Sequence, residues 1–325
     1  MAGRQVSAMS LGTVQLGLNY GIANNEGKPG REKSFSILSA AADEGITALD
    51  TARAYGDSEE VLGAFFRTAP GLANKIFITT KLSSGLPAGS SASEVEKALV
   101  QSVETSLSNL GLPKTNCLLL HSAADMTIHG PAVAKTLERL VLRGLTDMAG
   151  VSVYHPAEVD QLLLNEVYRA VQLPMNVFDL RFQKTGAIER LASRGVKVFV
   201  RSVFFQGLLF LDPDAESAGP GNPGGISGAR LPADLVPYAA SHLRKLRRLS
   251  DRAGMSIAQF AITFLRDMPG ITSLVLGADN PDQVKQNSAL FESPALNESL
   301  RHEAEDAFVD LDYPGVMSVL SRPKA

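Results

Sequence analysis

The sequence predicts a single-domain α/β protein whose strands close into a (β/α)8 barrel, the TIM-barrel architecture. Short apolar segments flanked by turn residues alternate along the chain with amphipathic helical segments, which is typical of βα units. Eight such units are recognised, the number that closes a barrel. The 325 residues can hold one barrel of roughly 250 residues together with longer loops and terminal helices.

Each predicted strand is a nearly continuous apolar run, as expected for a parallel sheet that is buried on both faces. The eight strands are predicted at residues 8–12, 46–50, 76–81, 117–121, 150–153, 175–178, 196–202 and 271–276. An open doubly wound sheet is the alternative architecture. It would normally carry a glycine-rich fingerprint in its first strand–helix turn.

Amphipathic patterns between the strands predict the helices. Ser93 and Glu96 have the spacing of a capping box, so Ser93 is expected to cap the helix that they open. The predicted helices are residues 32–44, 93–109, 131–143, 157–165, 185–194, 237–253, 257–267, 281–290 and 297–311.

Two predicted connections are longer than a compact barrel normally needs. Residues 17–31 and 211–230 are rich in glycine, asparagine and proline, and such loops are usually either functional lids or surface segments without regular structure. The domain prediction is therefore one barrel over residues 1–325, with these two loops and closing helices within 281–311.

The composition excludes several classes of function. The chain has 31 basic and 34 acidic residues, a net charge of −3 and no long run of like charges, which argues against binding to nucleic acid or to an anionic membrane. The single cysteine, Cys117, excludes a disulfide framework and a cysteine-based metal site, and it is expected to be a buried, inert thiol. No segment resembles a membrane span or a signal peptide, so no membrane partner is predicted and a cytoplasmic protein is expected.

Ionisable side chains end three consecutive predicted strands. Asp50 ends the second strand, with Tyr55 in the loop that follows, and Lys81 and His121 end the third and fourth strands. Taken singly, an aspartate here would cap a turn and a histidine would be a structural hydrogen-bonding residue. Because the C-terminal ends of barrel strands face one active site, the combination predicts a shared site.

The chemistry of this set is that of a general acid acting on a carbonyl. A neighbouring ammonium favours the phenolate form of a tyrosine, so Lys81 would make Tyr55 a better proton donor. Asp50 would keep Lys81 charged and oriented, and His121 would donate a hydrogen bond to a substrate oxygen. No His-Glu-x-x-His pattern is present and no Gly-x-Ser-x-Gly elbow follows a strand, which disfavours metal-assisted and serine hydrolases; no metal site is predicted.

These residues resemble the aldo-keto reductase family. The most specific part of the resemblance is residues 49–56, Leu-Asp-Thr-Ala-Arg-Ala-Tyr-Gly, and similarity extends from Leu11 to Asn287. The resemblance implies a catalytic tetrad of Tyr55, Lys81, Asp50 and His121. In it, the tyrosine is the proton donor, the lysine and aspartate tune it, and the histidine orients the carbonyl.

The resemblance also implies a nicotinamide cofactor. Gly150-Val-Ser-Val153 is similar to the family's Gly-Val-Ser-Asn, whose Ser and Asn hold the carboxamide, so Ser152 fits and Val153 departs from the pattern. Gln172 matches the family glutamine beside the carboxamide, and Asn176 is either a second polar group nearby or a strand-end hydrogen bonder. Where many members have an aromatic residue on the nicotinamide, this chain has Arg201, which would stack by its guanidinium or contact substrate or pyrophosphate. The other implied cofactor-binding residues of this half are Thr13, Asp50, Ser202, Phe204 and Gln206.

Residues 276–287 resemble the segment that binds adenosine, in which a helix N-terminus meets the 2′-phosphate. Gly277, Gln283 and Asn287 stand at its binding positions, although Gly277 and Gln283 replace the family's usual Lys and Arg. Asp279 would repel a 2′-phosphate. Arg230 is either a phosphate clamp or an exposed loop charge. NADP is the cofactor that the resemblance implies, with NAD as the alternative.

The sequence therefore predicts an enzyme that reduces an aldehyde or ketone with NAD(P)H. A nicotinamide-binding regulatory module, like the potassium-channel β subunits of this fold, and an unrelated barrel lyase or isomerase remain open. Candidate residues of the carbonyl pocket are Val14, Gln15, Tyr20, Arg53, Ser83 and His155. Arg53 and Arg201 indicate an anionic or polyhydroxy substrate. No heptad pattern indicates an oligomeric state.

Overall fold

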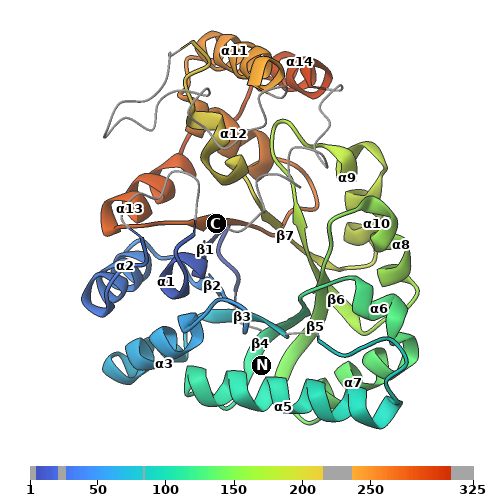
Figure 1. Ribbon diagram of the computed structural model, residues 1–325. Helices are drawn as coiled ribbons and strands as arrows, with labels where there is room; N and C mark the ends of the chain where they lie inside the picture. The colour runs from blue at the N-terminus through green and yellow to red at the C-terminus, as the bar shows by residue number, and fades with distance from the viewer. Residues whose placement is uncertain (1–4, 21–26, 83–84, 215–235, 309–325) are drawn as a thin grey trace.

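The computed structural model describes residues 5–20, 27–82, 85–214 and 236–308. Eight parallel strands, hydrogen-bonded in the order of the sequence, close into a barrel, which confirms the predicted fold class (Figure 1). The strands are β1 (Met9–Gly12), β2 (Ala48–Asp50), β3 (Phe77–Leu82), β4 (Thr115–Leu120), β5 (Thr146–Ser152), β6 (Tyr168–Pro174), β7 (Lys197–Arg201) and β8 (Ser273–Gly277).

A ring of helices covers the outside of the barrel (Figure 1). These are α2 (Arg31–Asp43), α3 (Ser58–Thr68), α5 (Ala92–Leu110), α7 (Gly130–Leu142), α8 (Pro156–Leu163), α10 (Ala187–Ser193), α12 (Ile257–Arg266) and α13 (Pro281–Leu290). Shorter elements in the connections are α1 (Val14–Gly17), α4 (Pro70–Ala73), α6 (Ala124–Ile128), α9 (Arg181–Lys184) and the 3₁₀ turn η1 (Phe205–Phe210).

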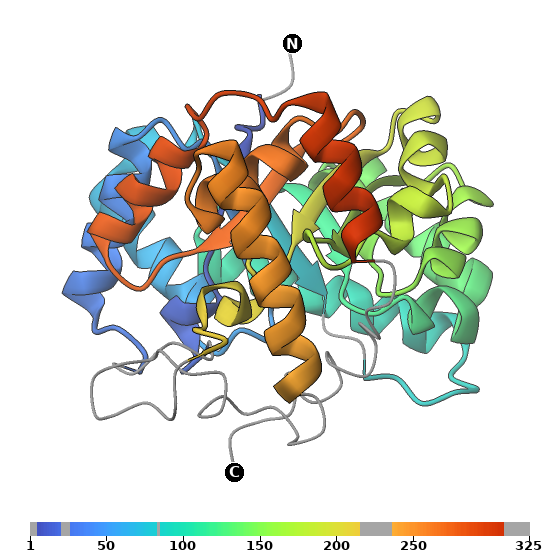
Figure 2. The same cartoon turned by 90° about the horizontal axis from the view of Figure 1, so that it is seen from above.

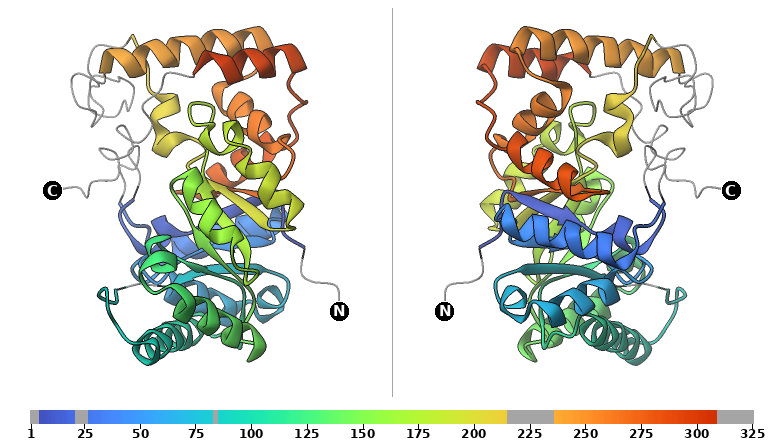
Figure 3. Two further views of the ribbon diagram at one scale, coloured as in Figure 1. Left: turned by 90° about the vertical axis from the view of Figure 1, so that its right-hand side faces the viewer. Right: turned by 90° about the vertical axis from the view of Figure 1, so that its left-hand side faces the viewer.

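Two further helices lie outside the ring. Helix α11 (Val236–Ala253) packs against α12 and against α14 (Glu298–Ala307). In Figure 2, α11 is the long orange helix that crosses in front of the strands, and Figure 3 shows α11 and α14 side by side. Among the described residues, no helix is long and apolar enough to cross a membrane.

Side chains fill the interior of the barrel below the C-terminal ends of the strands. The rings of Phe77 and Phe199 stack there with centroids 6.1 Å apart, beside Cys117 and Leu119. Cys117 is buried, as predicted, and burial raises the pKa of its thiol to about 12. The packed interior leaves the C-terminal ends of the strands as the open end of the barrel, where loops can build a site.

Three sequence predictions of secondary structure are wrong. The sixth strand is β6 at Tyr168–Pro174 and not residues 175–178, which lie in the loop after it. The strand β6 does not form a continuous apolar run in the sequence, because Arg169 and Gln172 interrupt it. Arg169 is exposed, and Gln172 faces the site. Helix α3 was not predicted at all, although its apolar face is buried.

The third error concerns the residue at which a helix begins. Helix α5 is capped by Ser91 and not by Ser93, since Ser91 and Glu94 form the reciprocal hydrogen bonds of the capping box. The sequence Ser-Ala-Ser-Glu-Val-Glu contains two overlapping boxes, and only the first is used. The closing helix predicted at 297–311 ends at Ala307, and residues from 309 lie outside the described part of the chain. Residues 21–26 and most of the predicted loop 211–230 also lie outside it.

Candidate active site

A buried ion pair lies at the C-terminal ends of β2 and β3. Lys81 Nζ is 2.8 Å from both carboxylate oxygens of Asp50, and it donates a third hydrogen bond to the carbonyl oxygen of Thr51 at 3.0 Å. Burial of the Lys81 ammonium is the largest single influence and acts to lower its pKa, but Asp50 and Tyr55 together outweigh it. The pKa of Lys81 is therefore raised, and Lys81 is positively charged at neutral pH.

Tyr55 and His121 lie directly beside this pair. Lys81 Nζ is 4.9 Å from the centroid of the Tyr55 ring, and the Tyr55 and His121 rings meet edge to face with centroids 5.8 Å apart. The four side chains that the sequence singled out thus come together from the ends of β2, β3 and β4.

His121 is held in its neutral form. Burial and then the positive charge of Lys81 lower the pKa of the His121 imidazole to about 4, with Arg201 adding to the effect and Asp50 opposing it. At neutral pH the ring therefore has one N–H donor and one nitrogen acceptor.

Close backbone contacts fix the turn that carries Tyr55. The Tyr55 amide donates to the carbonyl of Ala52, and the Tyr55 carbonyl accepts from the amide of Ser58. Gly17 packs against this turn so closely that a Cβ at residue 17 would lie 1.7 Å from the Tyr55 oxygen. The turn therefore requires glycine at position 17.

Thr13 ties the end of β1 to the same region. Its hydroxyl donates to the Asp50 carbonyl at 2.9 Å and contacts the Ser58 hydroxyl at 2.8 Å. The Thr13 side chain is fully buried, so it holds the strand ends together.

Two buried polar side chains on neighbouring strands have polar atoms without a hydrogen-bond partner among the described residues. Ser152 on β5 and Gln172 on β6 are paired in register and are 2% and 1% exposed. Gln172 Nε2 donates to Asp50 at 2.7 Å, whereas its Oε1 and the Ser152 hydroxyl make no hydrogen bond within the described chain. A free acceptor beside a hydroxyl matches the donor and acceptor of a carboxamide, so this pair fits the nicotinamide group that the sequence implies. Asn176 does not join them, because its side chain bonds the backbone of Phe178 and Ser202.

Arg201, at the end of β7, contacts an aromatic residue that sequence reasoning missed. Its guanidinium lies over the Tyr154 ring, 4.1 Å from the centroid, and Nη2 makes a long 3.4 Å hydrogen bond to the Val153 carbonyl. The signal for Tyr154 was its place directly after the predicted strand 150–153. Tyr20 is close enough that both Tyr55 and Arg201 act on it, in opposite directions.

The turn after β7 has an unusual backbone. Ser202, Phe205 and Gln206 have φ between 52° and 61°, in the left-handed region that non-glycine residues seldom adopt. Phe204, which the resemblance also places here, packs its ring on Phe210 with centroids 5.0 Å apart. Such backbone strain is typical of ligand-binding turns.

In the segment that resembles an adenosine site, the polar side chains support the loop. Gln283 Oε1 accepts from the Asp279 amide at 2.7 Å, and Asn287 Nδ2 donates to the Gly277 carbonyl at 3.2 Å. A Cβ at Gly277 would lie 2.0 Å from Nε2 of Gln15, whose Oε1 is buried without a hydrogen-bond partner in the described chain. Arg230 lies outside the described residues.

The candidate residues of the carbonyl pocket separate into different roles. Arg53 is neutralised by the buried Glu59 at 3.0 Å, so it belongs to a structural ion pair. His155 is exposed and lies 3.5 Å from Arg181, away from the tetrad contacts. Val14 is the first residue of α1, Tyr20 is exposed, and Ser83 lies outside the described residues.

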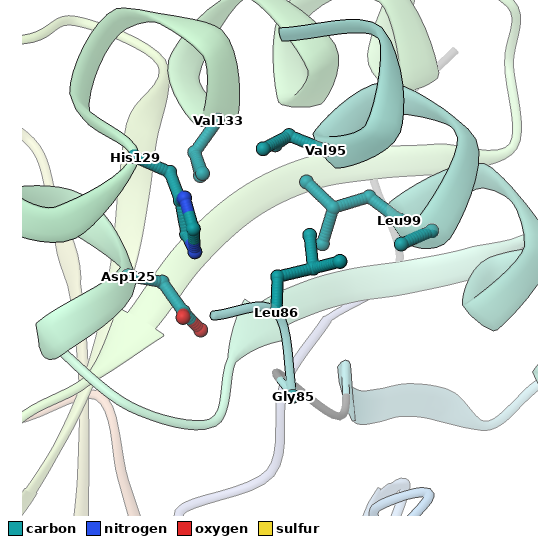
Figure 4. A pocket seen from close by; sticks show the side chains of 8 residues that line it. Gly85, Leu86, Val95, Leu99, Asp125, His129 and Val133 are labelled. Atoms are coloured by element: carbon teal, nitrogen blue, oxygen red, sulfur yellow. The ribbon is translucent and has the colours of Figure 1, made fainter. Parts of the chain in front are cut away.

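A cavity of about 310 Å³ lies outside the barrel, between α5 and α7 (Figure 4). Its walls are Leu86, Val95, Leu99 and Val133, and Asp125 and His129 point into it. None of the predicted site residues lines it, so it is separate from the tetrad. No group of three or more potential metal ligands occurs among the residues with described positions.

Comparison with known proteins identifies the family. A family model described as "Aldo/keto reductase family" matches residues 8–302. The chain belongs to the aldo/keto reductase family. It is therefore an oxidoreductase of a family that typically uses NAD(P)H and acts on small carbonyl compounds. Family membership removes the barrel lyase or isomerase from consideration.

Relatives within the aldo/keto reductases differ in their named activities. The chain is 27% identical over 301 residues to an L-glyceraldehyde 3-phosphate reductase of Escherichia coli (strain K12), covering 86% of this chain and 84% of that protein. It is 28% identical over 259 residues to a 6-dehydroglucose reductase of Agrobacterium fabrum, covering 76% and 78%. It is also 25% identical over 309 residues to a putative voltage-gated potassium channel subunit beta of Schizosaccharomyces pombe, covering 88% and 85%.

Solved aldo-keto reductases share the fold of this member. The holo form of AKR11C1 from Bacillus halodurans matches with a TM-score of 0.70 at 21% identity, covering 95% of each chain. The glycerol dehydrogenase AKR11B4 from Gluconobacter oxydans matches with a TM-score of 0.71 at 22% identity, covering 98% of this chain and 94% of that one.

Proposed function

We propose that this aldo-keto reductase reduces an aldehyde or ketone to an alcohol with NAD(P)H. The observation that carries the proposal is the buried Lys81–Asp50 pair beside the Tyr55 ring, with a neutral His121 that meets the same ring edge to face. No other described group combines a hydroxyl proton, a fixed ammonium and a neutral donor at the strand ends.

In this proposal Tyr55 is the general acid. When bound, the reduced nicotinamide supplies the hydride that adds to the carbonyl carbon. Tyr55 donates its hydroxyl proton to the carbonyl oxygen as negative charge develops there. The Lys81 ammonium then stabilises the phenolate that remains, and Asp50 holds that ammonium in place through two hydrogen bonds.

His121 orients the carbonyl. Because its pKa is lowered to about 4, it is uncharged at neutral pH and donates a hydrogen bond without competing with Tyr55 as an acid. The edge-to-face contact of the two rings keeps the side chains of Tyr55 and His121 adjacent.

The proposed cofactor contacts follow the strand ends around the barrel. Ser152 and Gln172 hold the carboxamide, and Gly277 lies at the adenosine end, with the Gln15 side chain packed against it. The remaining proposed contacts are Thr13, Asp50, Ser202, Phe204, Gln206, Gln283, Asn287 and Arg230. Arg201, which the resemblance places beside the nicotinamide, is assigned to the substrate instead in the next subsection. NADP(H) is the proposed cofactor, with NAD(H) as the alternative. The small-molecule carbonyl partner, the absence of a nucleic-acid or membrane partner and a cytoplasmic location stay predictions.

The test is turnover by the wild-type protein. Oxidation of NADPH and NADH is followed by absorbance with a panel of sugar, aliphatic and aromatic aldehydes and ketones, and the alcohol product is identified by mass spectrometry. The proposal predicts stoichiometric alcohol formation with at least one class. It is wrong if the protein binds a nicotinamide cofactor but no carbonyl of the panel is reduced.

A regulatory module is the second candidate, because one relative is named as a potassium channel subunit beta. Fluorescence titration distinguishes the two candidates. Tight binding of NADPH without carbonyl reduction supports the module, whereas binding together with turnover supports the reductase.

A further inference from the structure

We propose that Arg201 binds an anionic group, a carboxylate or a phosphate, on the carbonyl substrate. The proposal rests on the proposed reductase function and adds the class of substrate. It predicts that the enzyme prefers aldehydes or ketones that carry an oxyanion over neutral carbonyl compounds of the same size.

The first step is that no described carboxylate neutralises the charge of Arg201. Within the described chain, the only hydrogen bond of its side chain is the long one to the Val153 carbonyl, and no carboxylate lies within ion-pair distance. The other two arginines near the strand ends are different. Arg53 pairs with Glu59 at 3.0 Å and Arg181 with Asp179 at 2.8 Å.

The second step is where this charge lies. Arg201 helps to lower the pKa of His121 and acts on Tyr20, which in turn interacts with Tyr55. The guanidinium is therefore close to the groups proposed to hold the carbonyl. Among the described residues, Lys81 is paired with Asp50 and His121 is neutral, so Arg201 gives the site one unpaired positive charge.

The third step is that the guanidinium is held in place. It lies 4.1 Å from the centroid of the Tyr154 ring, and the Arg201 carbonyl is fixed by the Met175 amide at 3.1 Å. A guanidinium supported on one face by an aromatic ring keeps its N–H edges available for two parallel hydrogen bonds to an oxyanion. Such a fork recognises a carboxylate or phosphate and has no comparable partner on a neutral aldehyde.

The experiment compares charged and neutral aldehydes of similar shape. The ratio of kcat/KM for glyceraldehyde 3-phosphate over glyceraldehyde, and for succinic semialdehyde over butanal, is measured with NADPH for wild type, Arg201→Gln and Arg201→Lys. The matched control is Arg169→Gln, which removes an exposed arginine near the start of β6, at the other end of the barrel.

Wild type is expected to favour the charged member of at least one pair. Arg201→Gln lowers that ratio about 10- to 100-fold, in line with the loss of charge-assisted hydrogen bonds, and Arg201→Lys restores part of it. Arg169→Gln leaves the ratio as in wild type.

Two results overturn the proposal. One is a wild-type enzyme that reduces carbonyl compounds without preferring the charged member of either pair. The other is an unchanged ratio in Arg201→Gln, and weaker NADPH binding by that variant in a fluorescence titration would then assign Arg201 to the cofactor. A wild-type protein that reduces no carbonyl compound of the wider panel contradicts the reductase function itself, and this result is distinguishable from failure of the Arg201 proposal alone.

Discussion

Gln172 on β6 donates a hydrogen bond from Nε2 to Oδ1 of Asp50 on β2, at 2.7 Å. The two residues are 122 positions apart in the sequence, and the bond spans the end of the barrel. Asp50 thus receives donors from both Lys81 and Gln172. The proposed cofactor contact and the proposed catalytic ion pair are therefore parts of one buried network.

The first prediction follows from that bond. Gln172→Met removes the donor to Asp50 and the carboxamide acceptor while keeping the volume of the side chain. We expect the Kd for NADPH to rise by up to about tenfold, because the hydrogen bond lost to the neutral carboxamide contributes about 0.5–1.5 kcal/mol. Fluorescence titration measures this. The control Gln101→Met changes an exposed glutamine of α5, and equal affinities of the two variants would contradict the network.

The second prediction concerns the Lys81–Asp50 pair. Lys81→Met leaves the Asp50 carboxylate buried without its ammonium, so we expect a loss of about 3–5 kcal/mol in the free energy of unfolding. The double variant Asp50→Leu/Lys81→Met removes both charges and is expected to be less destabilised than the sum of the single variants. Urea denaturation at neutral pH measures all four proteins. Additive losses would show that the two side chains do not interact.

The third prediction tests the packing under the Tyr55 turn. Gly17→Ala would place a methyl group 1.7 Å from the Tyr55 carbonyl, so the turn has to move. We expect a lower melting temperature and a loss of turnover of at least about tenfold, because a small displacement of a proton donor slows catalysis strongly. The control is Gly71→Ala in α4, where a Cβ meets no atom within 4 Å. Equal activity of the two variants would show that the contact does not position Tyr55.

The fourth prediction is a pH dependence of stability. The pKa of His121 is about 4 in the folded protein and about 6.5 when unfolded, so the unfolded state binds a proton first as the pH falls. The contribution of this histidine is complete above pH 6.5 and is lost between about pH 6.5 and 4, by up to about 3 kcal/mol. Urea denaturation of wild type and His121→Gln across this range isolates it. Parallel curves for the two proteins would contradict a neutral, buried imidazole.

The sequence predicted the barrel because each strand is buried on both faces and so has a continuous apolar run. It failed at β6, where Gln172 breaks the run because it faces the site, and the apolar residues 175–178 of the next loop imitated a strand. Helix α5 was placed two residues late because two capping boxes overlap. These errors arise where a local sequence pattern is compatible with two positions of a strand or a helix start, and tertiary contacts select one of them.

The part of the candidate site that could be predicted consists of the ionisable residues that end the strands. Asp50, Lys81 and His121 were found because ionisable groups rarely end buried strands. The contact of Arg201 with Tyr154 and the pairing of Arg53 with Glu59 were not predictable, since both depend on side-chain directions that the sequence does not specify. The two arginines look equivalent in the sequence, and only the structure shows that one is neutralised.

The most direct test of the proposed mechanism is the rate of hydride transfer in Tyr55→Phe. The variant is loaded with NADPH and mixed rapidly with the best carbonyl substrate of the wild type, and a single turnover is followed. The account predicts a rate about 10²–10⁴-fold below wild type with NADPH affinity nearly unchanged, because only the proton donor is lost. Tyr168→Phe, the same change at a buried tyrosine that starts β6, is expected to keep the wild-type rate. A Tyr55→Phe enzyme that transfers hydride as fast as wild type would contradict the assignment of Tyr55 as the general acid.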